Sequence, residues 1–178
     1  LVEASGTFES LVEPGIQTTE IGGSNIFQIQ YNIWKYLHKQ DTDVLLSTME
    51  IPNIVSIIAA KSLNSISVVL RCANVNSMKE RQGKYRLLPT IKRLTYPYAD
   101  SIITISDGVA CDLAQVMNVN KSNMMTTIYN PAYDSNIQTK AREPVPTEWL
   151  TDDEKDVAIG VGSMKQQKDF ATLIRAVQ

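Results

Sequence analysis

Residues 99–131 read ADSIITISDGVACDLAQVMNVNKSNMMTTIYNP and contain a complete strand–helix–strand pattern. The run Ser101–Ile105 is short and apolar, which is typical of a strand buried on both faces. Ser106 stands where a helix N-cap belongs, and the following residues are apolar at helical spacing. The run 124–129 predicts the next strand. Two such strands joined by a helix indicate a parallel pair with a crossover connection.

The same pattern recurs earlier in the chain. Two further apolar runs, 43–47 and 66–71, are each followed by a helical pattern. We therefore expect an α/β fold, with a Rossmann-like, doubly wound parallel sheet and helices on each face. The four strands should be parallel neighbours, because each is too apolar to leave one face in water. We also expect a short strand at 16–21 and a helix capped by Ser24.

Composition excludes several classes of protein. The chain has 178 residues, 43% of them hydrophobic, and a formal net charge of −2, so bulk charge does not attract nucleic acid. No apolar run is long enough to cross a bilayer. Cys72 and Cys111 lack metal-ligand spacing and are expected to be buried, reduced thiols of a cytoplasmic protein. His38 is the only histidine, which excludes a histidine-based metal cluster and disfavours a Ser-His-Asp triad.

One segment of the chain contains a cluster of basic residues, although the net charge of the whole chain is slightly negative. Its members are Lys79, Arg81, Lys84, Arg86, Lys92 and Arg93. We expect a solvated helix face, with an anionic acceptor or membrane headgroups as the alternative partners.

The composition of the chain changes after the last predicted strand. Prolines and polar residues predict a linker over 136–155, between a first domain at 1–135 and the start of a second at 156–178. The second domain is expected to begin with one strand, a polar loop and one helix. The apolar stripe of that helix is Phe170, Leu173, Ile174 and Val177. Because the chain starts without methionine and stops inside this unit, we expect a fragment of a longer protein.

Candidate binding residues follow from strand ends, because ligands of open parallel sheets bind at the carboxyl ends of the strands. The run 70–74 presents Arg71 and Asn74 at one such end, and Asn130 follows the last strand. The carboxylates are scattered and offer no evident acid/base pair.

A third candidate is the loop that starts at Gly160. It is not a dinucleotide fingerprint, because Lys165 occupies the third glycine position. Gly162 and Ser163 would let a ligand approach the backbone, and Lys168 would supply a cation beside a helix capped by Asp169. From these residues alone, a solvated lysine in an ordinary loop is the favoured interpretation.

Longer motifs carry a resemblance. YADSIITISDGVACDLAQVMNVNKSNMMTTIYNP, at 98–131, resembles the end of the N-terminal domain of retaining GT-B glycosyltransferases of the "group 1" family. VGSMKQQKDFATLIRAV, at 161–177, is similar to the start of that family's donor-binding domain. The segments DVLLSTMEIPNIVSIIAAKS, at 43–62, and VVLRCAN, at 68–74, resemble its middle strands and helices.

The resemblance implies an incomplete N-terminal half of a GT-B fold and the start of the second half. It implies transfer of a sugar, with retention, from a nucleotide-sugar donor to a saccharide or lipid-linked acceptor, without an essential metal or another cofactor. The setting would be cell-surface polysaccharide, lipopolysaccharide or glycolipid synthesis in the cytoplasm, with a peripheral contact at the inner face of the membrane left open. The residues it assigns are Gly162, Ser163 and Lys168 at the donor diphosphate, Arg71 and Asn74 on the acceptor side, and Asn130 at the hinge. The catalytic residues are unassigned, because the paired glutamates of the family are expected beyond Gln178.

Two departures from the family leave alternatives open. Ser163 stands in place of the family's arginine, and Cys72 or Ala73 in place of a histidine. A non-catalytic relative that binds sugar nucleotides is therefore the main alternative. A nucleotide-dependent oxidoreductase is a second alternative, disfavoured by the missing fingerprint. The fragment itself is expected to be inactive, and the sugar, nucleotide, acceptor, linkage and oligomeric state are unassigned.

Overall fold

The computed structural model describes residues 12–63, 65–74, 86–119, 124–131, 135–144, 147, 150, 156–164 and 168–177. Contacts between Cα atoms divide the chain into two compact units, Leu1–Asn130 and Pro131–Gln178. The linker predicted over 136–155 falls within the second unit and stays a prediction, as does the domain boundary at residue 135. Residues 1–4, which also have the composition of a strand, lie outside the described residues.

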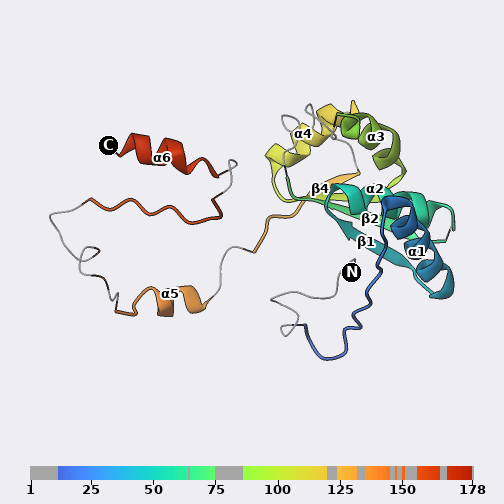
Figure 1. The fold of residues 1–178 in the computed structure, drawn as a ribbon, viewed down its shortest axis with the longest axis horizontal. Coiled ribbons are helices and arrows are strands. Elements are labelled where there is room, and N and C mark those ends of the chain that lie inside the picture. The colour runs from blue at the N-terminus through green and yellow to red at the C-terminus, as the bar shows by residue number, and fades with distance from the viewer. Residues whose placement is uncertain are drawn as a thin grey trace. The chain divides into compact units, whose positions relative to one another are not determined.

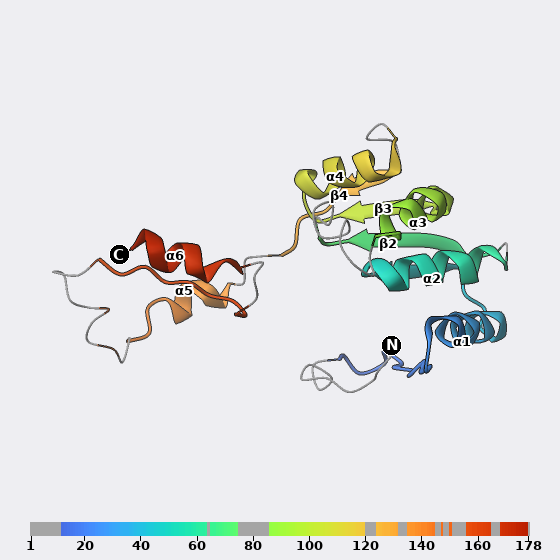
Figure 2. The ribbon, with the colours of Figure 1, turned by 45° about the horizontal axis from the view of Figure 1, so that its top comes forward.

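The first unit is built on a four-stranded parallel sheet (Figures 1 and 2). Its strands are β1 (Val44–Thr48), β2 (Ser67–Cys72), β3 (Ser101–Thr104) and β4 (Met125–Thr127). They lie in the order β1-β2-β3-β4, and each neighbouring pair is parallel. The prediction of four parallel neighbours is therefore confirmed, and the fold is α/β and consistent with a Rossmann-like arrangement.

In the described part of this unit, α1 (Ile26–Lys39) precedes β1, and the other helices connect the strands. These are α2 (Glu50–Lys61), α3 (Leu88–Thr95), the 3₁₀ turn η3 (Tyr96–Tyr98) and α4 (Asp107–Met117). Strands in sequential order with right-handed crossovers place all connecting helices on the same face of the sheet. The contacts agree with this rule: α2 packs on β1 and β2, α4 packs on β3 and β4, and α3 contacts both α2 and α4. The expected doubly wound arrangement, with helices on each face, is therefore not found among the described residues, because the strands follow one another in chain order. Helix α1 packs against α2 (Figure 2).

The core lies between the sheet and these helices. Val68, Leu70 and Ile102 point to the helices and are completely buried. The opposite face differs, because Val44 and Leu46 of β1 are 57% and 61% exposed. The expectation that no strand leaves one face in water is therefore wrong for β1, since α2 covers only the other side of this edge strand.

Local signals predicted the cap of α4 correctly, but not the cap of α1 or the first strand. Ser106 caps α4 as predicted, with its hydroxyl accepting from the Val109 N–H at 3.2 Å. The cap of α1 is Asn25 instead of Ser24, because the Asn25 side chain accepts from the Gln28 N–H at 3.0 Å. The strand expected at 16–21 is not formed, since this segment pairs with no strand among the described residues.

One polar clip ties α2 to the sheet. The Asp100 carboxylate accepts from the Lys61 ammonium at 2.8 Å and from the Val68 N–H at 2.7 Å. The Asp100 N–H in turn donates to the Val68 carbonyl at 2.9 Å. The hydrogen bond from Lys61 is the main reason why the pKa of Asp100 lies below its usual value. The clip therefore fixes the start of β2 against the turn before β3.

Replacing Asp100 by alanine is expected to lower the free energy of unfolding by about 1–2 kcal/mol at pH 7, because it leaves the buried Val68 N–H without its acceptor. Urea unfolding followed by circular dichroism measures this. Asp100→Asn keeps an acceptor oxygen and removes only the charge. Because the folded pKa is lowered, the charge stabilises the fold above about pH 4 and loses its effect as the pH falls through the folded pKa. The gap between wild type and Asp100→Asn should thus shrink on acidification; a gap that grows would contradict the clip.

The described part of the second unit contains two short helices, α5 (Asn136–Lys140) and α6 (Phe170–Ala176). The predicted helix is present, but the strand predicted before it is not: residues 156–161 are exposed and form no ladder. A strand needs a hydrogen-bonding neighbour, and the described part of this unit supplies none. The predicted stripe of α6 is also not buried, since Leu173, Ile174 and Val177 are exposed.

Candidate functional site

Side chains from separate strand ends meet at the carboxyl edge of the sheet. The Arg71 guanidinium, near the end of β2, donates to the Asn130 amide oxygen at 2.8 Å. Its other terminal nitrogen lies 3.4 Å from the Thr48 hydroxyl at the end of β1. The structure therefore brings together two residues that the sequence analysis singled out, Arg71 and Asn130, and adds Thr48 to them.

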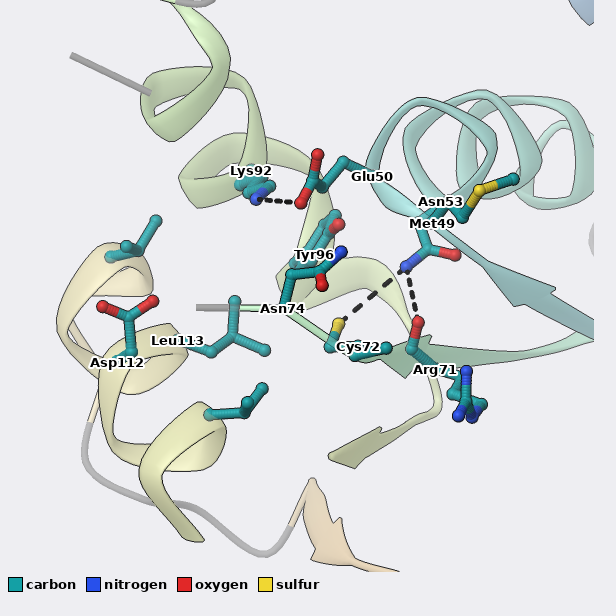
Figure 3. Close-up of a pocket in the computed structure, with 13 residues that line it drawn as sticks. Met49, Glu50, Asn53, Arg71, Cys72, Asn74, Lys92, Tyr96, Asp112 and Leu113 are labelled. Carbon is teal, nitrogen blue, oxygen red and sulfur yellow. Dashed lines mark hydrogen bonds and ion pairs between the residues drawn. The ribbon is translucent and has the colours of Figure 1, made fainter. Parts of the chain in front are cut away.

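A small pocket opens beside the end of β2 (Figure 3). It has a volume of about 40 Å³, enough for a few water molecules or one small polar group. Helices α2, α3 and α4 surround it, and Asn74 lies on its rim. The lining residues are Met49, Glu50, Asn53, Arg71, Cys72, Ala73, Asn74, Lys92, Tyr96, Val109, Asp112, Leu113 and Val116. Arg71 and Asn74, the two predicted acceptor-side residues, both line this pocket, but the Arg71 guanidinium points away from Asn74 (Figure 3) and bonds to Thr48 and Asn130 instead.

Asn53 fixes the backbone at this strand end. The side chain is 1% exposed, and its amide nitrogen donates to the Arg71 carbonyl at 3.3 Å and to the Cys72 sulfur at 3.8 Å. Figure 3 shows both bonds reaching from α2 to β2. The amide oxygen of Asn53 is buried and has no hydrogen-bond partner in the part of the chain that the structure describes. Asn53 therefore couples the first turns of α2 to the segment that carries Arg71.

The Cys72 thiol is not a nucleophile or base at neutral pH. Burial raises the pKa of Cys72 to about 11, while Lys92 opposes this rise and Glu50 adds to it. A thiol that stays protonated is unreactive, because the thiolate is the nucleophilic form. Among the predicted buried thiols, Cys72 is half-buried and Cys111 is exposed, so the expectation of burial is wrong for Cys111.

Lys92 is the main residue that sequence reasoning missed. Its side chain is buried in the pocket wall, with the ammonium 4.0 Å from the Glu50 carboxylate. The interpretation of the basic cluster as a solvated helix face is therefore wrong for Lys92; Arg86 and Arg93 are exposed, and Lys79, Arg81 and Lys84 lie outside the described residues. The spacing Leu88–Lys92–Tyr96, four residues at each step, is the signal that places Lys92 on the inner side of α3.

A second polar group of side chains lies at the ends of β3 and β4. The Asp107 carboxylate accepts from the Thr127 hydroxyl at 3.0 Å and from the Tyr129 hydroxyl at 3.1 Å. The Thr104 hydroxyl lies 3.2 Å from that of Thr127. This chain of hydroxyl groups links the start of α4 to β4, and the sequence analysis had interpreted the run at Asp107 only as a helix start.

In the second unit, Lys168 lies against the backbone of the predicted donor loop. Gly162 has a φ of 157°, and a Cβ added there would lie 3.3 Å from the aliphatic carbons of Lys168. Ser163 and Lys168 are both exposed. Asp169 precedes α6 but does not cap it as predicted: its carboxylate accepts from the Thr172 hydroxyl at 2.8 Å instead of from a backbone N–H. The first turn of α6 is therefore not capped by the Asp169 side chain.

Among the described residues, no group of three or more His, Cys, Asp or Glu side chains is arranged to hold a metal ion. None of the helices described has the length and apolar character needed to cross a membrane. No protein-family model matches the chain, and no curated protein is significantly similar to it.

Proposed function

We propose that this chain belongs to a GT-B enzyme that transfers a sugar from a nucleotide-sugar donor to a saccharide or lipid-linked acceptor with retention. The observation that carries the proposal is the Arg71–Asn130 contact, with Thr48 beside it, at the carboxyl edge of the parallel sheet. Ligands of such sheets bind at this edge. A fixed guanidinium there suits an oxygen-rich ligand such as a saccharide or a phosphorylated lipid headgroup.

In the proposed reaction, the bond between the anomeric carbon and the donor diphosphate breaks, and an acceptor hydroxyl oxygen forms the new bond. The proton of that hydroxyl is released together with the nucleoside diphosphate. Lys168 would neutralise charge on the departing nucleoside diphosphate, so no resident metal is needed for that role. Gly162 and Ser163 would leave room for the diphosphate beside the backbone. Arg71 and Asn74 would orient the acceptor, and Asn130 would hold Arg71. The catalytic groups are not assigned.

A non-catalytic protein that binds sugar nucleotides is the second candidate. Cys72 or Ala73 stands where the resembling family often has a histidine. Neither would supply a base, because alanine has no proton-accepting group and burial raises the pKa of Cys72 to about 11. Ser163 also removes one of the cations that the family places at the diphosphate. In this alternative the chain binds a sugar nucleotide without transfer. For the enzyme, the proposal includes the synthesis of a cell-surface polysaccharide or glycolipid in the cytoplasm.

Saturation-transfer NMR with the 178-residue chain tests binding. We expect weak binding, with a Kd of about 1 mM, for one class of nucleoside diphosphate sugar, because a site with few contacts gives low affinity. UDP-, GDP-, ADP- and TDP-sugars form the panel. Lys168→Ala should abolish the signal, and Lys140→Ala, an exposed lysine on α5, should leave it unchanged. Absence of binding across the panel, or equal binding by Lys168→Ala, would contradict the proposed donor site.

The same chain is expected to show no sugar transfer in a radiolabelled-donor assay. Preorganised charge stabilisation usually supplies the largest share of the rate enhancement, and Lys168 is the one cation proposed at the donor diphosphate. Detectable transfer by the 178 residues alone would overturn this expectation.

A further inference from the structure

One side of α1 carries four ring-bearing residues, Phe27, Tyr31, Trp34 and His38, which form an aromatic ridge. Steps of four, three and four residues place them along one line of the helix. Neighbouring rings are stacked: the centroids of Tyr31 and Trp34 are 6.0 Å apart, and those of Trp34 and His38 are 5.2 Å apart. Yet Phe27 is 79% exposed and Tyr31 is 57% exposed. Phe27 and Tyr31 of the ridge therefore lie in solvent, whereas Trp34 is half-buried and packs against the core at its base.

The apolar surface continues from α1 onto α2. A groove of about 300 Å³ runs between the two helices, lined by Phe27, Gln30, Tyr31, Trp34, Ile58, Ala59 and Ser62. Ile58 and Ile51, seven residues apart on α2, are both exposed. Large exposed apolar patches mark binding surfaces, because a monomeric protein rarely leaves such patches in water. The ridge and α2 thus form one continuous surface for an apolar partner.

The charges of α1 indicate the kind of partner. The helix has no Asp or Glu, whereas Lys35 and Lys39 lie one step round the helix from the ridge. Aromatic rings beside lysines are typical of helices that lie in the interface of a membrane, where rings sit at the headgroup level and lysines meet anionic lipids. Glu20 lines a separate hollow with these two lysines, so the cationic side is only partly compensated.

We propose that the aromatic ridge docks this unit onto an anionic lipid bilayer, with α1 lying along the surface. Phe27 and Tyr31 enter the interface, and Lys35 and Lys39 contact the anionic headgroups. The proposal rests on α1 and α2 alone and does not depend on the proposed sugar transfer. Failure of membrane binding would leave the nucleotide-sugar experiment unaffected.

Tryptophan fluorescence with lipid vesicles tests the proposal. The chain has two tryptophans, so the measurement uses Trp149→Phe protein, in which Trp34 is the only reporter. Titration with mixed vesicles of phosphatidylcholine and phosphatidylglycerol, which carry a negative surface potential, should shift the Trp34 emission to the blue. Vesicles of phosphatidylcholine alone should bind at least about tenfold more weakly, because each lysine near an anionic surface contributes about 1 kcal/mol.

Two variants and one matched control locate the surface. Phe27→Ala with Tyr31→Ala should weaken vesicle binding at least about tenfold, which is the loss expected on removing one buried ring. Lys35→Gln with Lys39→Gln should abolish the preference for anionic vesicles. Tyr98→Ala removes an equally exposed tyrosine from η3 and should change nothing. Circular dichroism confirms that each variant is folded.

Three outcomes would overturn the proposal. The first is no shift of the Trp34 emission, and the second is equal binding to both kinds of vesicle. The third is a dimer that sedimentation detects without lipid and that Phe27→Ala dissociates, because the ridge would then bind a second copy of the chain.

Discussion

An active protein that contains this chain is expected to lose about a hundredfold in kcat/KM for sugar transfer when Lys168 is replaced by alanine. The aliphatic part of Lys168 lies against Gly162, so the loop holds the ammonium close to the backbone where the diphosphate is proposed to bind. Negative charge on the leaving diphosphate grows in the transition state, and an interaction that strengthens there raises the rate. Ser163 supplies no second cation. The effect should therefore be larger than where two cations share the charge.

Steady-state kinetics with the donor varied measures this loss. Lys168 is exposed, so the melting temperature should not move, which separates a lost contact from a lost fold. Lys140→Ala, on α5, is the matched control and should leave the kinetics unchanged. If Lys168→Ala protein transfers sugar at a near-normal rate, the side chain is a solvated lysine in an ordinary loop.

The largest effect on stability is expected for Leu70→Ala in β2. Leu70 is completely buried between the sheet and its helices. Its truncation should lower the free energy of unfolding by about 2–5 kcal/mol, from lost burial and from the cavity left behind. Since small domains are stable by only about 5–15 kcal/mol, the variant should unfold at a much lower urea concentration.

Leu46→Ala on the neighbouring strand is the matched control for this experiment. Leu46 lies on the opposite face of the sheet and is 61% exposed. The same substitution should change the free energy of unfolding by no more than about 0.5 kcal/mol. An equal loss for both leucines would show that the face of the sheet that carries Leu46 is covered in solution.

Patterns confined to one segment were predictable. Each of the four strands appeared as a short apolar run, and Ser106 was identified as the cap of α4. The two strands that were predicted wrongly, at 16–21 and 156–161, have one cause in common. Both runs have the composition of a strand, but composition does not show whether a second strand lies beside them. A strand forms only where a second strand accepts and donates its hydrogen bonds, and the described residues offer none at either place.

The site shows the same division between local and distant information. Arg71 and Asn130 were chosen because each lies at or just beyond the carboxyl end of a predicted strand. The structure places both residues at that edge of the sheet. Lys92 was assigned to solvent because it belongs to a run of basic residues, although its spacing from Leu88 and Tyr96 places it inside. Charge composition was the weaker guide, because the side of a helix on which a residue lies depends on its position and not on its type.

The sequence by itself determined that this chain forms four parallel strands joined by helices, and that polar residues follow those strands. Hydrophobic periodicity carries that information, because the spacing of the apolar residues along a segment indicates which of them are buried. Only the tertiary structure decided that Arg71 meets Asn130, 59 residues away, and that Asp107 receives the hydroxyl groups of Thr127 and Tyr129. Such contacts depend on the order and register of the strands, which place distant strand ends at one edge of the sheet and which no single segment encodes.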